Sequence, residues 1–167
     1  MVGSYQTITY NRYAVQSATK FKAKIVDIPF CDPESGFAIL IASRIEDGKS
    51  IVLKGIIPNP VENAYINYQG HWEQDARRGT QYVKVESSEI DYEAGSTDSI
   101  YELLTSGYVP GVEPVTAKKI IKAFGADSLK TIEKSPEKLT ELAGIKEKAA
   151  KKIHDAYIHI AKDQELI

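Results

Sequence analysis

The sequence contains only one cysteine, Cys31, among its 167 residues. It therefore cannot form an internal disulfide or assemble a cysteine-based metal site. Its three histidines show no metal-ligand spacing with carboxylates, so we expect no metal site. The chain also lacks an apolar run of about 18 residues and an amino-terminal basic stretch followed by an apolar core. These absences predict a cytoplasmic protein without a membrane span.

The chain also lacks an excess of basic residues, because its formal net charge is −2. Any contact with nucleic acid must therefore come from local patches rather than from the overall charge. Residues 99–167 contain 11 basic residues, all of them lysine, against 10 acidic residues. The lysines are clustered, so this half of the chain is where such a patch is expected.

An apolar content of 43% is sufficient for a core in one ample domain or two compact ones. Five segments alternate apolar and polar residues, which predicts five strands joined by turns without an intervening helix. The segments are KFKAKIVDIPF (20–30), GFAILIASRI (36–45), SIVLKGII (50–57), AYINYQGHWEQ (64–74) and TQYVKVESSEI (80–90). Five strands are typical of an oligonucleotide/oligosaccharide-binding (OB) barrel, with another five-stranded meander as the alternative. We predict a five-stranded antiparallel OB-like β-barrel over 20–94, preceded by a flexible arm or an extra edge strand over 1–19.

The apolar period becomes helical after the barrel, which predicts an all-α domain over 95–167 and an α+β chain overall. Two apolar stripes recur in this region, each preceded by a shorter apolar helix. The first stripe contains Ala117, Ile120, Ile121 and Phe124, and the second contains Ala150, Ile153, Tyr157 and Ile160.

The helical region repeats one motif, in GYVPGVEPVTAKKIIKAFG (107–125) and in LTELAGIKEKAAKKIHDAY (139–157). Gly111 aligns with Gly144, 33 positions later, and Lys118 aligns with Lys151. The pattern resembles the helix-hairpin-helix motif of DNA-binding proteins. In such a turn glycine permits a backbone conformation that other residues resist, and unpaired N–H groups at the next helix start face a phosphate. We therefore predict a sequence-tolerant phosphate-backbone site.

Both copies depart from the usual glycine–aliphatic–glycine turn, because Glu113 and Lys146 replace the second glycine. A carboxylate at position 113 would repel a phosphate, whereas Lys146 could contact one. We therefore expect the second hairpin to bind more strongly and the first to be weaker or mainly structural. The alternative is that both hairpins form only a scaffold. The predicted contacts are Gly111, Val112, Lys118, Lys119, Gly144, Ile145, Lys146, Lys148, Lys151 and Lys152.

The barrel offers a second candidate set in GHWEQDARRGTQYVKV (70–85). OB barrels bind single strands through stacked aromatics and nearby basic residues. Arg77 and Arg78 are predicted phosphate contacts, and Trp72 and Tyr82 are candidate stacking residues. A lone tryptophan in a small barrel belongs more often to the core, so the general burial of aromatics favours the core for Trp72.

These segments together resemble the amino-terminal region of the RecD-like ATP-dependent DNA helicases over about residues 20–160. The resemblance is carried by FCDPESGFAIL (30–40), IVLKGIIP (51–58), YQGHWEQDARRGTQYVKVESSEI (68–90) and LLTSGYVPGVEPVTAKKIIKAFG (103–125). It implies an OB-type barrel and tandem hairpins ahead of motor domains that unwind DNA 5′ to 3′ in repair and recombination. Those motors use ATP and magnesium, but no G-x-x-x-x-G-K-[ST] loop occurs in this sequence. We therefore expect a non-catalytic accessory region without a cofactor of its own.

We expect its partners to be single-stranded or junction DNA, the carboxy-terminal motor domains and, as a further option, a repair protein. Three rival functions remain at this stage. The modules could only orient the motor or dock a partner, or the chain could be a Holliday-junction-binding protein with the same two modules. A DNA glycosylase would need a catalytic Asp, for which Asp163, expected in a frayed tail, is the candidate.

Overall fold

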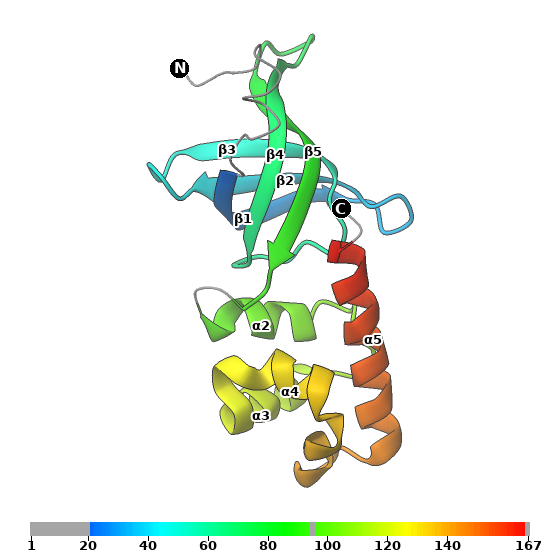
Figure 1. Ribbon diagram of the computed structural model, residues 1–167. Helices are drawn as coiled ribbons and strands as arrows, with labels where there is room; N and C mark the ends of the chain where they lie inside the picture. The colour runs from blue at the N-terminus through cyan, green and yellow to red at the C-terminus, as the bar shows by residue number, and fades with distance from the viewer. Residues whose placement is uncertain (1–20, 94–95, 166–167) are drawn as a thin grey trace.

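The computed structural model describes residues 21–93 and 96–165. It contains a β-barrel followed by a group of helices, stacked one on the other along the long direction of the molecule (Figure 1). The predicted arm or edge strand over 1–19 lies outside the described residues.

The barrel consists of the five predicted strands. They are β1 (Phe21–Cys31), β2 (Phe37–Arg44), β3 (Ser50–Ile56), β4 (Tyr65–Gln74) and β5 (Gln81–Asp91). The strands close in the order β1-β2-β3-β5-β4, with β4 also paired to β1. Alternate residues such as Leu40, Leu53 and Ile66 are fully buried, as the period of two requires.

The predicted purely antiparallel barrel is wrong in one pair, because β3 and β5 run parallel. The reason is geometric. Neighbouring strands in a ring can all alternate in direction only if their number is even, so a closed ring of five needs a parallel pair. The other four pairs are antiparallel, and the parallel pair joins β3 to β5, two strands with β4 between them in the sequence.

The helical part contains α2 (Thr97–Leu104), α3 (Pro114–Phe124), α4 (Ser128–Lys134) and α5 (Glu147–Glu165). Two short 3₁₀ segments, η1 (Gly125–Asp127) and η2 (Pro136–Glu141), connect them. The two predicted apolar stripes are buried or packed against the core. The shorter helix expected before the second stripe is the 3₁₀ segment η2, which contains the buried Leu139. The sequence pattern did not single out α4.

The two parts are joined by a hydrogen-bond network at the end of α5. Gln164 is 7% exposed; its Oε1 accepts from the Ile90 N–H at 2.8 Å, and its Nε2 donates to the Pro58 carbonyl at 2.9 Å. Its Nε2 also donates to the Tyr92 hydroxyl at 3.1 Å. The expectation that Asp163 lies in a frayed tail is wrong, because it lies within α5 and accepts from an Asn59 amide at 2.9 Å.

Candidate nucleic-acid interface

The first hairpin turn lies between α2 and α3. Gly111 is exposed and has a φ of +80°, a backbone conformation that favours glycine. Glu113 caps α3 without a side-chain bond, and its carbonyl accepts from Ala117 at 2.9 Å. Pro114 carries no N–H, so two free backbone donors remain at this helix start within the described chain, those of Val115 and Thr116.

The second hairpin turn lies between η2 and α5 and has the same geometry. Gly144 is exposed with a φ of +89°, and the Lys146 carbonyl accepts from Ala150 at 2.9 Å. The N–H groups of residues 147–149 have no hydrogen-bond partner among the residues that the structure describes. This helix start therefore offers three free donors at the positive end of a 19-residue helix.

The two aliphatic turn residues anchor the hairpins instead of facing solvent. Ile145 is 5% exposed, and its N–H donates to the Leu142 carbonyl at 3.2 Å. Val112 is partly buried against the core. Both side chains therefore hold their turns in position.

The two hairpins form one surface. The Lys119 ammonium on α3 donates to the Ala143 carbonyl at 3.2 Å, directly before the second turn. Conversely, the first turn lies near α5, because Pro110 of that turn and Lys152 of α5 line the same groove. Each turn therefore lies beside the lysine-bearing helix of the other copy.

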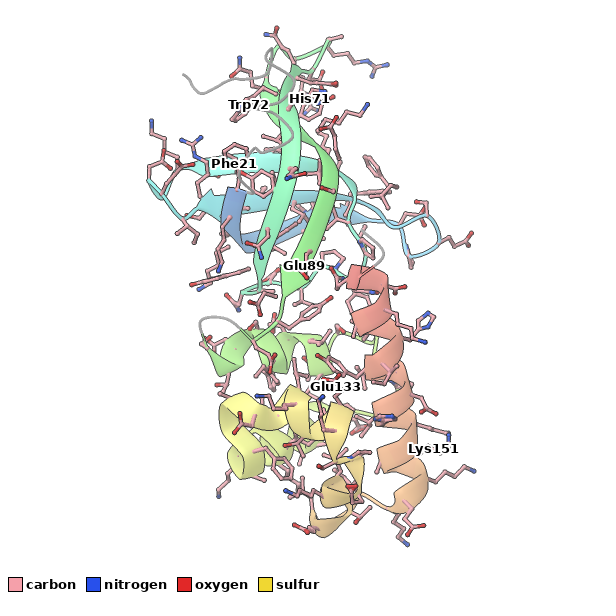
Figure 2. The ribbon with its side chains drawn as sticks, in the orientation of Figure 1. Phe21, His71, Trp72, Glu89, Glu133 and Lys151 are labelled. Atoms are coloured by element: carbon pink, nitrogen blue, oxygen red, sulfur yellow. The ribbon has the colours of Figure 1, made fainter. Side chains whose placement is uncertain are left out.

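The predicted lysines of this surface are all exposed. They are Lys118, Lys119, Lys146, Lys148, Lys151 and Lys152. Lys151 points away from α5 (Figure 2) and pairs with Asp155 at 3.0 Å, one helical turn later. Such exposed pairs contribute only about 0.3–0.5 kcal/mol, so a phosphate could displace the carboxylate. The carboxylates of Glu113 and Glu147 also lie exposed at the helix starts.

The barrel candidates do not form one aromatic platform. Trp72 lies opposite Val83 and Tyr82 lies opposite Glu73 on the β4–β5 hairpin. Because successive residues of a strand point to opposite faces, the rings of Trp72 and Tyr82 lie on opposite sides. Trp72 is 45% exposed, so the expectation that it belongs to the core is wrong.

The face that carries Tyr82 is a network of charged side chains. The Tyr82 hydroxyl donates to Glu73 at 3.0 Å, and His71 contacts Glu73 at 2.8 Å and Glu86 at 3.3 Å. The bond to His71 is the main cause that lowers the pKa of Glu73, and the bond to Tyr82 is the second cause. The same Glu73–Tyr82 bond raises the pKa of Tyr82. The Lys54 ammonium lies 4.1 Å from the centre of the Tyr82 ring, a contact that the sequence did not reveal. The ring is therefore already covered by a cation on this face.

Arg77 and Arg78 lie exposed on the loop that joins β4 and β5. The backbone N–H groups of Arg77 and Arg78 donate to one carboxylate oxygen of Asp75 at 2.8 and 3.1 Å. These two bonds lower the pKa of Asp75. This loop lies at the end of the barrel farthest from the α5 start (Figure 1). The structure thus places the arginines and the hairpin lysines in two separate sites.

Residues 21–93 and 96–165 contain no group of three or more His, Cys, Asp or Glu side chains that could hold a metal ion. Within the same ranges, no helix is both long and apolar enough to cross a membrane.

The barrel and the paired hairpins define the class of the protein: an OB-fold module followed by a tandem helix-hairpin-helix module, an arrangement consistent with nucleic-acid binding. Residues 18–92 match the family model of the OB-fold domain of the ATP-dependent DNA helicase YrrC. Residues 101–156 match the model of the SAM-like helix-hairpin-helix tandem. No individual curated protein matches the chain. The resemblance to the amino-terminal region of the RecD-like helicases is thereby confirmed in both modules and in their order.

Proposed function

We propose that this chain binds the phosphate backbone of single-stranded or junction DNA without sequence specificity, as an accessory region beside a helicase motor. The observation that supports this most is the second hairpin: an exposed glycine turn, lysines at one helix start and three N–H groups without a partner in the described part of the chain. Anions are stabilised at such a helix start by the N–H groups and by the helix dipole. ATP and magnesium would serve the motor domains of the full-length helicase, and this region would need neither for binding.

The second hairpin is expected to dominate, because among residues 21–93 and 96–165 it offers three free donors against two at the first. Lys146 also stands where the first copy has Glu113. The contacts would be Gly144, Lys146, Lys148, Lys151 and Lys152, with Arg77 and Arg78 as a separate second set.

The test is the affinity of the chain for a fluorescent 5′-tailed duplex, measured by anisotropy over a range of salt concentrations. Replacing Lys146 and Lys151 by glutamate should weaken binding of all sequences alike. It should make the negative slope of log affinity against log salt shallower by about 1.4 for contacts to the single-stranded tail, at about 0.7 per lost contact.

The control carries the same charge change at Lys134 on α4 and Lys162 at the far end of α5, both exposed. If the control weakens binding as much as the hairpin variant, only the net charge matters and the hairpin assignment is wrong. If the unaltered chain shows no salt-dependent affinity for DNA, the modules act as a scaffold for the motor or a repair partner.

A further inference from the structure

A groove of about 700 Å³ runs between the first hairpin turn, one side of α5 and the barrel loop that contains Asn59. Its size is within the range of about 300–1,000 Å³ that is typical of ligand sites. The residues that α5 contributes follow a single stripe of the helix, from Lys152 near its start to Asp163 near its end. The groove therefore leads from the proposed phosphate-binding surface towards the barrel.

Part of the groove lining is apolar. Tyr108 and Pro110 line it from the first hairpin, and Ile160 lines it from α5. The Tyr108 hydroxyl donates to the Pro60 carbonyl at 2.9 Å, which fixes the ring against the barrel loop. A rigid aromatic ring beside proline and isoleucine suits a flat, apolar-faced group such as a nucleobase.

The charges of the groove are arranged along its length. Lys152 lies at the hairpin end and has no ion-pair partner within the described residues. Asp155, which pairs with Lys151, and Asp163, which accepts from the Asn59 amide, also line the groove, so Lys152 is the lining residue that can contact a phosphate. The hairpin end can therefore accept a phosphate, and the barrel end presents amide and carboxylate groups that can bond to a base edge.

We propose that this groove holds an unpaired nucleotide of the strand whose backbone is bound at the hairpins, an inference that rests on the proposed function. Bases within a duplex are stacked and paired, so only an unpaired base can place its face against these side chains. The groove would make the protein prefer a single-strand tail or a junction to a blunt duplex.

The test compares a 5′-tailed duplex with a blunt duplex of the same sequence, using the whole chain. His159 is exposed and lines the groove, so His159→Glu adds a negative charge there. We expect this variant to bind the tailed duplex about fivefold more weakly, because the added charge repels the phosphates on either side of the bound base, and to bind the blunt duplex unchanged. Ala126→Glu adds the same charge on an exposed residue outside the groove and should change neither affinity.

A second measurement does not depend on the variants folding. A tail that carries 2-aminopurine at successive positions should change fluorescence on binding at one or two positions beside the junction, and a duplex 2-aminopurine should not. The groove assignment is overturned if both DNAs respond equally to His159→Glu, or if no tail position responds. Loss of all binding by the unaltered chain would instead overturn the proposed function.

Discussion

The junction between barrel and helices depends on Gln164, and replacing it by leucine tests how firmly the two parts are joined. Leucine has a similar size but would leave the Ile90 N–H and the Pro58 carbonyl without their partner. A buried polar group left without a partner costs about 1–3 kcal/mol. For two such groups we expect a loss of about 3 kcal/mol in the free energy of unfolding, since some of the cost is offset by the apolar side chain.

For a chain of this length, 1 kcal/mol shifts the melting temperature by about 2–4 °C, so Gln164→Leu should lower it by roughly 6–12 °C. The assay is thermal unfolding followed by circular dichroism, together with hydrogen exchange at the Ile90 amide, which should lose protection. Lys162→Leu is the matched control, because it makes an apolar change on an exposed position of the same helix. A melting temperature within about 2 °C of the unaltered chain, with Ile90 still protected, would refute the reasoning.

Two further predictions concern the second turn and the buried tyrosines. No atom lies within 4 Å of a Cβ added at Gly144, so a substitution there should cost stability only through its positive φ. Gly144→Ala should cost about 1–2 kcal/mol, and Gly144→Asn should cost less because asparagine adopts the left-handed conformation more readily than alanine; equal losses in thermal melts would contradict this cause. Burial is the main cause that raises the pKa of Tyr68, Tyr108 and Tyr157 to about 12, above the value of about 10 expected in the unfolded chain. Because the pKa is raised in the folded state, these groups make their full contribution to the free energy of unfolding below pH 10. This contribution is lost as the pH rises towards 12. In an alkaline titration, the tyrosinate absorbance of these residues should therefore rise together with unfolding. Reversible ionisation of all tyrosines near pH 10 in the folded protein would disprove this prediction.

The strands and both apolar stripes could be predicted because each is encoded in a local period. Alternation locates a strand, but the choice of neighbour is a long-range property. The parallel pair could nevertheless have been predicted from the number of strands alone. An odd number of strands in a closed ring excludes complete alternation of direction.

Trp72 shows where a burial rule fails. Its partner in register is Val83, which is 5% exposed. The indole therefore lies on the same side of the β4–β5 hairpin as the residues that face the barrel core. However, β1 pairs with β4 only up to Tyr68, and β3 pairs with β5 only over 83–85. The end of the hairpin extends beyond its neighbours and leaves that side uncovered. Strand length relative to neighbouring strands cannot be read from one segment.

Gln164 and Asn59 could not be assigned a role from local pattern, because the partners of their side chains lie 72 to 106 positions away in the chain. One signal was present in the sequence. Gln164 continues the buried stripe of α5 four residues after Ile160, and a polar residue on an apolar stripe needs a specific partner.

The side of α5 opposite the groove bears on the path that the proposed DNA strand would take. There a smaller pocket at the junction of barrel and helices is lined by Glu89, Asp91, Glu93 and Glu133. Figure 2 places Glu89 and Glu133 at this junction. Burial, followed by the charge of Asp91, raises the pKa of Glu93, as expected where carboxylates lie close together. A phosphate backbone would be repelled on this side, whereas the groove side begins at Lys152. Because Gln164 fixes α5 to the barrel, the proposed DNA strand would leave the hairpins along the groove rather than across the acidic pocket.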